Sequence, residues 1–298
     1  MPNSLAIIGA GRVGRTLGRG LREAGWKIGS VVTRSEASAR RAVHFIGAGK
    51  AWAGLTRQVL LSQVILITTP DDQIAAVGRE LARIGEGELR GRVVLHTSGA
   101  TDSSALEPLR AHGAIVGSMH PLQSFSGVAM PSLEGRVFAI EGETQAVRVA
   151  RRVARELGGS PVRVAGSKKP LYHAAAAMAS GHILALEEAA TQLLVSLGMK
   201  RREAVRALLP LTRQVLDNFE RLGPRAAWTG PLARGDFKVV RAHLQALRES
   251  PMEIAHAYEA LSRLAARVLA QDTAGTLAEL EKSSVKMITR AKATGGNA

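Results

Sequence analysis

The chain has 298 residues with 46% hydrophobic content, which predicts two domains of ordinary size, and without cysteine it can form neither disulfides nor thiolate metal sites. Its net charge of +15 is spread evenly over both halves and only 3% of residues are aromatic, which argues against a nucleic-acid partner. No apolar run reaches the roughly 18 residues that span a bilayer, so the sequence predicts a cytoplasmic protein with no membrane partner.

The first half of the sequence alternates β-rich runs with helical patterns, as in parallel βαβ units. The predicted strands cover residues 5–8, 28–33, 64–68, 93–96, 115–119, 137–140 and 162–164. The predicted helices cover residues 13–24, 37–46, 74–84, 146–157, 170–197, 201–222, 237–248 and 251–270. We therefore predict an α/β fold: an N-terminal Rossmann-type dinucleotide-binding domain with a mostly parallel sheet (1–166), then a C-terminal all-α helical domain (167–298).

The first predicted strand runs into a glycine-rich turn. Gly9, Gly11 and Gly14 have the spacing G-x-G-x-x-G between an apolar strand and a helical pattern, which is the context of a dinucleotide site. Gly9 would allow the tight turn, Gly11 the approach of a pyrophosphate, and Gly14 close packing of helix on strand. Arg12 and Val13 belong to the same predicted cofactor site. The alternative is a glycine-rich turn that binds nothing.

The end of the second predicted strand indicates which dinucleotide binds. An NAD site usually has an acidic residue about 20 residues after the turn, to bind the ribose 2′-hydroxyl. Thr33, Arg34 and Ser35 stand there instead. Arg34 can pair with a 2′-phosphate, the two hydroxyls can donate to it, and Arg40 can add charge. We therefore predict NADP, with NAD less favoured; the alternative makes Arg34 a surface residue and assigns the ribose to Glu36.

The third predicted strand ends in Thr69 and Pro70, followed by two aspartates. Loops at the carboxyl ends of parallel strands line the ligand crevice of such folds. We expect Thr69 and Pro70 to flank the cofactor ribose. The same letters are also a helix-start signal, with Asp71 or Asp72 in the first turn, and both interpretations can hold together.

Polar side chains also end the next two predicted strands. His96 and Ser98 follow the fourth strand, and Ser118 and His120 close the fifth. One such histidine can be a capped loop residue, but two on the crevice side favour a site. No histidine spacing typical of a metal site occurs, so no metal is predicted.

Residue 170 opens a long alanine-rich helical pattern that begins with unusual residues. Lys169 and His173 are four apart and would share one face of the helix. Pro170 suits the first helical position, which would leave Lys169 at the cap, where lysine is disfavoured. A residue that breaks local rules invites a functional explanation. The alternatives are a surface lysine and a satisfied buried histidine, and His182 is expected to be structural.

Four stretches, "HTSGA", "GSMHPLQSF", "LYHAAAAMAS" and "TGPLARGD", resemble the short-subunit dehydrogenase-like oxidoreductases. Their C-terminal half is the domain of unknown function 2520. Similar in plan are pyrroline-5-carboxylate reductase, ketopantoate reductase, the β-hydroxyacid dehydrogenases and the F420-dependent NADP oxidoreductases. The resemblance implies a homodimer formed through the helical domain. Several relatives use a Lys-x-x-x-Asn pair, which Lys169 and His173 match except for the histidine.

Two further motifs accompany this resemblance. The family continues "A-S-N" on the helix, whereas this chain has Gly181 in place of the asparagine. Arg234 and Asp236 belong to a Gly- and Pro-rich loop between helices. They could reach a substrate or a partner subunit, or the loop could be only a connection.

Together these observations predict an NADP(H)-dependent oxidoreductase for a small polar carbonyl, such as a ketopantoate-like 2-keto acid, or an imine. The expected catalytic residues are Lys169, His173, His120 and Ser98, because hydride transfer needs groups that polarise the acceptor and an acid that supplies a proton. The alternative is an NADP-binding sensor or assembly module without catalysis, which the glycine at position 181 favours.

Overall fold

The computed structural model describes residues 3–127 and 130–282. The chain divides into two compact units, Met1–Gly181 and His182–Ala298, which we call unit 1 and unit 2. The predicted boundary after residue 166 lies just beyond the sheet, and unit 1 extends further because the helix that follows contributes Lys169 to its interior.

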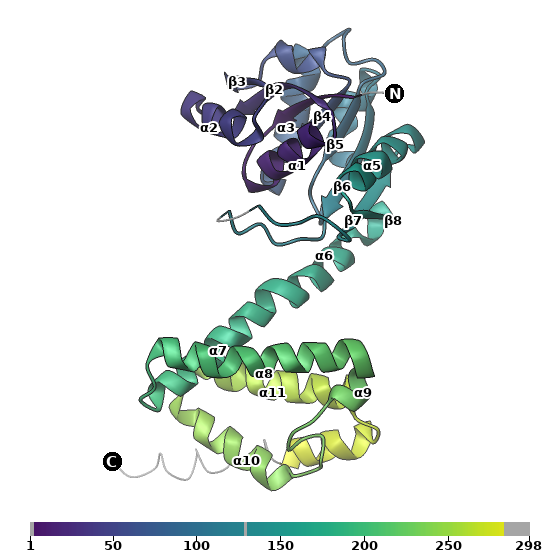
Figure 1. Ribbon diagram of the computed structural model, residues 1–298. Helices are drawn as coiled ribbons and strands as arrows, with labels where there is room; N and C mark the ends of the chain where they lie inside the picture. Colours follow the sequence, from purple (N-terminus) through teal and green to yellow (C-terminus); the bar gives the residue numbers. More distant parts are fainter. Residues whose placement is uncertain (1–2, 128–129, 283–298) are drawn as a thin grey trace, which may run out of the picture. The chain divides into compact units, whose positions relative to one another are not determined.

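Unit 1 contains one sheet in the order β3-β2-β1-β4-β5-β6-β7-β8 (Figure 1). Its strands are β1 (Ser4–Ile8), β2 (Lys27–Thr33), β3 (Lys50–Ala53), β4 (Val64–Ile67), β5 (Val93–His96), β6 (Ile115–Pro121), β7 (Val137–Gly142) and β8 (Ser160–Arg163). Strands β1 to β6 are parallel, β7 is antiparallel to β6, and β8 is parallel to β7. The predicted α/β class with a mostly parallel sheet is confirmed.

The strand order reverses between β1 and β4, so the connections on either side of β1 run in opposite directions along the sheet. Such a reversal opens a crevice at the carboxyl ends of the strands, where α/β proteins bind ligands. The edge strand β3 was not predicted from the sequence, because its four residues "KAWA" contain no β-branched side chain.

Helices cover both faces of the sheet. They are α1 (Arg12–Glu23), α2 (Glu36–Ile46), η1 (Arg57–Leu61), α3 (Asp71–Ile84), η2 (Ser103–Leu106), α4 (Glu107–Ala111) and α5 (Thr144–Glu156). Along β1, Leu5 and Ile7 join a core with α1, α2 and α5, whereas Ala6 and Ile8 join a second core with α3 and α4. This alternation follows from the two-residue period of a strand and holds the strand ends rigidly.

The predicted helix over 170–197 is interrupted. Unit 1 ends in η3 (Gly166–Lys168), α6 (Lys169–Ala177) and most of η4 (Met178–His182), which is a π-helical turn. The helix therefore begins at Lys169 and not after it, so the predicted cap position of this lysine is wrong; Lys168 precedes the helix instead. Single π turns often mark functional segments of helices.

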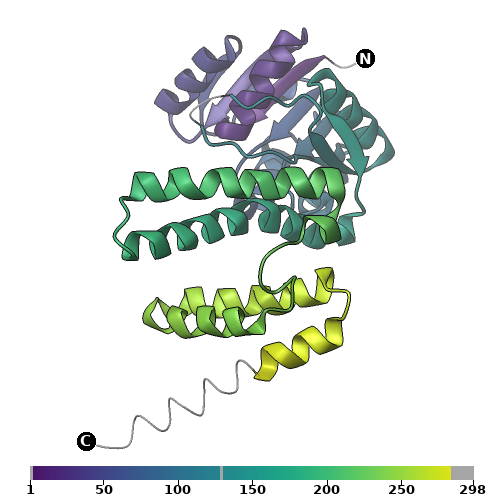
Figure 2. The same ribbon diagram turned by 60° about the horizontal axis from the view of Figure 1, so that its bottom comes forward.

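Unit 2 consists of helices. They are α7 (Ile183–Ser196), α8 (Arg201–Leu222), α9 (Pro224–Ala227), α10 (Phe237–Ala246), η5 (Leu247–Glu249), α11 (Met252–Leu269) and a helical run over 273–282. Figure 2 shows α7 beside α8 and α10 beside α11. The predicted all-α C-terminal region is confirmed, although α9 and the run over 273–282 were not predicted. In the described ranges no helix has both the length and the apolarity needed to cross a bilayer.

Candidate functional site

The glycine-rich turn lies against the end of β4. Gly9 has φ +88°, and a Cβ atom on it would lie 2.6 Å from Thr69 Cγ2 and 2.7 Å from Thr69 N. A Cβ atom on Gly14 would lie 2.3 Å from Thr68 Oγ1, which donates a hydrogen bond to the carbonyl of Gly9 at 2.6 Å. Close approach therefore requires glycine at both positions, and the positive φ of the turn requires it at Gly9 as well. Sequence analysis did not assign Thr68 this role.

The N-terminus of α1 leaves its first backbone N–H groups without a side-chain cap, and no acidic residue lies in its first turn. Gly11 occupies the N-cap position, and a Cβ atom there would meet only one atom within 4 Å. Val13 packs against the core, whereas the Arg12 side chain is exposed and donates to the carbonyl of Phe125 at 3.4 Å. Open N–H groups beside a cation fit a pyrophosphate.

A second cation lies in the same helix turn. The Arg15 guanidinium donates to the carbonyl of Gly127 at 3.1 Å and lies 4.9 Å from the ring centroid of Phe45. Sequence analysis did not select Arg15, although its spacing of three from Arg12 places it on the same helix face.

The end of β2 carries the residues predicted to select NADP. Thr33 donates to the carbonyl of Ser35 at 2.8 Å, and the Ser35 hydroxyl accepts from the Ser38 N–H as the cap of α2. Arg34 is exposed, and no residue that the structure describes pairs with it. Glu36, the alternative ribose ligand, forms a 2.6 Å ion pair with Arg40. An unpaired guanidinium and an occupied carboxylate fit a 2′-phosphate better than a free ribose.

Thr69 follows β4 with a buried hydroxyl that has no hydrogen-bond partner. Pro70 is exposed and precedes α3, whose first turn contains Asp71 and Asp72, so the predicted helix start is also present. Buried polar atoms are almost always hydrogen-bonded in native proteins. In the described ranges only three buried side-chain nitrogen or oxygen atoms lack a partner: Trp52 Nε1, Thr69 Oγ1 and His173 Nδ1. Two of these atoms belong to predicted site residues: Thr69 was predicted to contact the cofactor and His173 the substrate. The unpartnered Thr69 hydroxyl fits a bound dinucleotide.

Lys169 is 1% exposed, and its ammonium group bridges two strand ends. Its Nζ donates to the carbonyl of Ser98, after β5, at 2.7 Å and to the hydroxyl of Ser118, in β6, at 2.6 Å. Burial lowers the pKa of Lys169 from 10.5 to about 8, and nearby carboxylates, Glu141 above all, limit that fall. The alternative of a surface lysine is therefore wrong.

His120, Tyr172 and His173 converge beside this lysine. The Tyr172 hydroxyl lies 2.9 Å from His120 Nδ1, and the His120 ring centroid is 5.6 Å from that of His173. A Cβ atom on Gly99 would lie 2.4 Å from His173 Nδ1 and 2.9 Å from His120 Nε2. Glycine at this position therefore leaves room for both imidazole rings. Sequence analysis missed Tyr172, although it shares a helix turn with Lys169.

Burial keeps His120 and Tyr172 neutral. It lowers the pKa of His120 to about 4, with the charges of His173 and Lys169 acting in the same direction, and it raises the pKa of Tyr172 to about 12. A neutral imidazole beside a phenol that holds its proton can accept, relay or donate a hydrogen bond without carrying charge.

Ser98 and His96 organise the loop after β5. The Ser98 hydroxyl donates to Asp71 at 2.6 Å and accepts from the N–H groups of Ala100 and Thr101. His96 is fully buried and lies between the Ser98 N–H and the carbonyl of Asp102, and burial lowers its pKa to about 4. His96 is thus the capped loop residue of the alternative interpretation.

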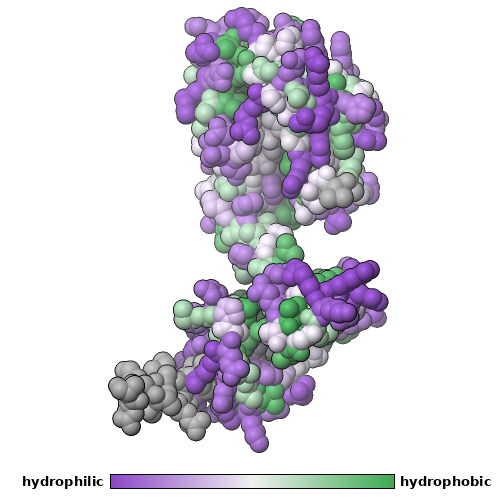
Figure 3. All heavy atoms as spheres, turned by 90° about the vertical axis from the view of Figure 1, so that its left-hand side faces the viewer, coloured by the Kyte–Doolittle hydropathy of each residue, from purple (hydrophilic) through white to green (hydrophobic). Residues whose placement is uncertain are grey.

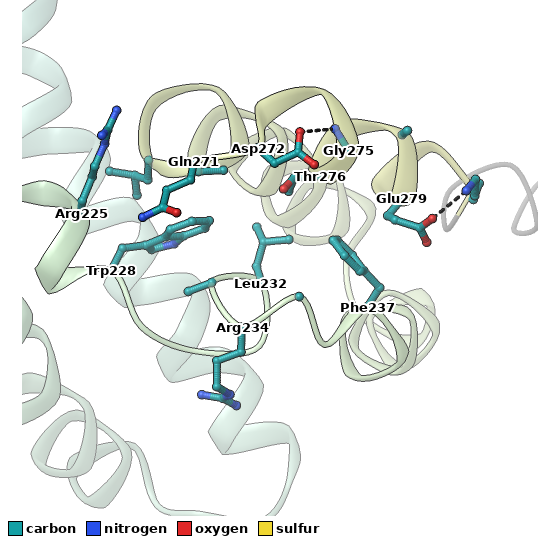
Figure 4. A pocket seen from close by; sticks show the side chains of 16 residues that line it. Arg225, Trp228, Leu232, Arg234, Phe237, Gln271, Asp272, Gly275, Thr276 and Glu279 are labelled. Atoms are coloured by element: carbon teal, nitrogen blue, oxygen red, sulfur yellow. Dashed lines mark hydrogen bonds and ion pairs between the residues drawn. The ribbon is translucent and has the colours of Figure 1, made fainter.

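A cavity of about 680 Å³ lies in unit 2, remote in sequence from this cluster. Figure 4 shows Trp228, Leu232 and Phe237 on one side of it and Gln271 and Asp272 on the other. Of the predicted candidates this cavity contains only Arg234, whose side chain points away from its interior in Figure 4. Asp236 accepts from the Val239 N–H as the cap of α10, which supports the interpretation of this loop as a helix connection.

Two remaining expectations concern Gly181 and metals. Gly181 lies in the π-helical turn, and a Cβ atom on it would meet no atom within 4 Å, so the backbone has room for a side chain there. Within the described ranges no group of three His, Asp or Glu residues could hold a metal ion.

Family models match two parts of the chain. Residues 2–121 match a Rossmann-like domain, and residues 136–265 match the domain of unknown function DUF2520. No curated protein sequence matches the chain.

Solved structures share this fold. A protein of Bacteroides fragilis, provisionally assigned as an NADP oxidoreductase, matches with a TM-score of 0.71 and 24% identity over 88% of this chain and 97% of its own. A protein of Thermotoga maritima matches with 0.68 and 28% over 87% and 96%. A reductive aminase from Aspergillus terreus, solved with NADPH and ethyl-5-oxohexanoate, matches with 0.67 and 19% over 90% and 94%.

Proposed function

Because the chain combines a Rossmann-like domain with a DUF2520 domain, we propose that it is an NADP(H)-dependent oxidoreductase that acts on a small polar carbonyl or imine. The observation that carries this proposal is the group formed by Lys169, His120, Tyr172 and His173 at the carboxyl ends of β5 and β6. It lies on the edge of the sheet that also bears the glycine-rich turn. The reductive aminase, solved with NADPH and a ketoester, supports the same class.

NADP would be held by three groups of residues in unit 1. The pyrophosphate would bind the open N–H groups after Gly11, near Arg12, and the 2′-phosphate would bind Arg34 with Thr33 and Ser35. The ribose would lie against Thr69 and Pro70, where the unpartnered Thr69 hydroxyl would gain a hydrogen bond. When bound, the reduced cofactor supplies the hydride.

The proton would come from the neutral groups. Tyr172, hydrogen-bonded to His120, can donate to an oxygen or nitrogen that gains negative charge, and His120 orients the phenol. His173 Nδ1 has no partner in unit 1 and can bind the same atom of the substrate. Lys169, predicted as a possible acid, has its ammonium turned to Ser98 and Ser118, so it would stabilise developing charge through the loop. Ser98 would position that loop.

These donors support a substrate with a polar atom that accepts a proton. A 2-keto acid of ketopantoate type remains our first candidate, and an imine formed from a ketone and an amine is the second. Both present one polar atom that must be protonated as the hydride arrives, and the neutral Tyr172 beside His120 can serve this need.

Cofactor binding tests the first half of the proposal. We expect NADPH fluorescence to rise on binding, with NADPH bound at least about tenfold more tightly than NADH, because the 2′-phosphate forms charge-assisted bonds. Arg34→Ala should remove most of this preference, and Arg41→Ala, an exposed arginine of α2 outside the proposed site, should retain it. Equal affinities for both cofactors in the parent protein would contradict the assignment.

Turnover tests the second half. NADPH oxidation should be screened with 2-keto acids alone and with ketones plus amines, and Tyr172→Phe should lower kcat by about a hundredfold with an active substrate because it removes a general acid. Leu171→Ala, at the exposed neighbouring position, is the control. Tight NADPH binding without any oxidation would favour the sensor or assembly module.

We also propose a homodimer formed through unit 2. Apolar side chains of α8 recur at helical spacing and remain exposed in the single chain: Leu211, Val215, Phe219 and Leu222. Figure 3 shows apolar residues at the surface of the helical part among hydrophilic ones. An exposed apolar stripe of this kind is typical of a protein interface.

A further inference from the structure

Lys169 would be difficult to retain as an ammonium ion without compensation. It is almost fully buried, and desolvation favours its neutral form. Its two hydrogen-bond acceptors, the Ser98 carbonyl and the Ser118 hydroxyl, are both uncharged. In the described ranges no carboxylate forms a direct ion pair with it. The compensating charge must therefore belong to a group that does not contact the ammonium directly.

Glu141 is the nearest candidate by connectivity. The Ser118 hydroxyl accepts from Lys169 Nζ and donates to Glu141 Oε1 at 2.6 Å, so one serine links the cation to a carboxylate. Glu141 is 7% exposed and also accepts from the N–H and hydroxyl of Ser103, at 2.8 and 2.9 Å. A buried carboxylate that accepts three hydrogen bonds is fixed in place.

The backbone sets this arrangement. In the antiparallel pair of β6 and β7, Ser118 lies opposite Glu141 and Gly117 lies opposite Gly142. A Cβ atom on Gly142 would lie 2.4 Å from Gly117 Cα, so only glycine allows the two strands to approach this closely. The adjoining serine and glutamate are thereby brought into direct contact.

We propose that Glu141 is a positioning residue of this site, which acts through Ser118 to keep Lys169 charged and fixed across the ends of β5 and β6. The inference rests on the proposed function, since it assigns that site its counter-charge. The other charged or titratable groups around Lys169 act more weakly than Glu141 or carry no charge. They are Asp102 and Asp71, which also stabilise the ammonium, and His96 and His120, which remain neutral beside it.

The test is the titration of Lys169 Nζ by ¹⁵N NMR in the full-length protein, with the signal assigned by its loss in Lys169→Met. In Glu141→Gln the pKa of Lys169 should fall by about one unit or more, which is about a tenfold rise in the ratio of its neutral to its charged form at a given pH. Glu141→Asp, which retains the charge, should restore most of the original value. Glu143→Gln is the matched control, because Glu143 also bonds the β6 backbone but pairs with Arg110 at the surface.

An unchanged Lys169 pKa in folded Glu141→Gln would overturn the inference. If that variant does not fold, Ser118→Ala replaces it, since this change breaks the link while Ser103 still binds the carboxylate; an unchanged pKa there also overturns it. The titration needs no substrate. A shifted pKa without any turnover would therefore support the role of Glu141 and contradict the proposed oxidoreductase activity. Turnover with an unshifted pKa would reject the inference alone.

Discussion

Unit 1 and unit 2 differ in how they bury their apolar residues. Unit 1 has two extensive cores, one on each face of the sheet, and most of its large aliphatic side chains are fully buried. Up to residue 282, where the described part of unit 2 ends, its core cluster contains only Val240, Leu244, Ala266 and Leu280 among buried residues, while many leucines and valines of α7, α8 and α11 remain exposed. A sheet with helices on both faces buries its apolar side chains within one chain, whereas the helices of unit 2 leave apolar faces exposed to solvent.

The difference teaches that the two units are built for different tasks. The rigid strand ends of unit 1 can hold Lys169, His120 and Thr69 in fixed positions, which binding and catalysis require. The exposed stripe of unit 2 is stabilised only if another surface covers it.

The largest effect is expected at the α8 stripe. Phe219→Glu should convert a dimer into a monomer, because it places a charge in an apolar interface. Light scattering should then report the chain mass of 31.5 kDa and not twice that value. Arg213→Glu, on an exposed position of the same helix outside the stripe, should leave the dimer intact. A parent protein that is monomeric at all concentrations would refute the proposed dimer.

The next largest effect concerns the glycine-rich turn. Gly9 and Gly25 have nearly the same positive φ, +88° and +87°, but a Cβ atom would strike Thr69 at the first and meet nothing within 4 Å at the second. Gly25→Ala should cost about 1 kcal/mol of stability and retain NADPH affinity. Gly9→Ala should also weaken NADPH binding more than tenfold, because the turn must move from β4. Equal affinities in both variants would show that the turn is not the cofactor site.

Acid should destabilise unit 1 through His96. Its folded pKa of about 4 lies below the ordinary 6.5, so between these values the unfolded chain binds a proton that the folded chain does not. The free energy of unfolding should therefore decrease by about 3 kcal/mol as the pH falls from 6.5 to 4. His96→Gln should remove this part of the slope, and His112→Gln, at an exposed position, should not. Urea unfolding in a Trp228→Phe background would follow only the tryptophans of unit 1.

Alkali should increase the stability of unit 1 through Lys169. Its folded pKa of about 8 lies below the ordinary 10.5, so above pH 8 the folded chain releases a proton that the unfolded chain keeps. Unit 1 should gain up to about 3 kcal/mol of stability between pH 8 and 10.5 from this group, opposed above pH 10 by the raised pKa of Tyr172. The gain should vanish in Lys169→Met and persist in Lys168→Met, whose lysine is exposed. A gain retained in Lys169→Met would assign it to another group.

The sequence predicted the sheet well because the central parallel strands β1, β4 and β5 are buried on both faces and consist mainly of valine, isoleucine and leucine. It missed β3 and the short helix α9, whose residues carry no such run and depend on their neighbours. The interrupted helix after Lys169 was also missed, since nothing in the alanine-rich stretch marks a π turn.

The candidate site was predicted in part. Residues at strand ends and on one helix face could be selected from spacing alone, which is why Lys169, His120 and His173 were found. Glu141 could not, because its partner Ser118 lies on a strand whose antiparallel pairing with β7 appears only in the folded sheet. Gly99 was missed because its role is to leave room for two rings that approach from other elements.

The smallest effect compares one helix cap in each unit. Asp236 caps α10 and Ser35 caps α2, and replacing either by alanine should cost about 1 kcal/mol. Measured without cofactor, Asp236→Ala should lower the transition reported by Trp228, and Ser35→Ala should lower the one reported by Trp52. Because the proposed dimer would stabilise only the unit that forms its interface, the Trp228 transition should also rise with protein concentration while the Trp52 transition stays constant. If Asp236→Ala instead lowers both transitions equally, the two units unfold together and the contrast between them does not extend to stability.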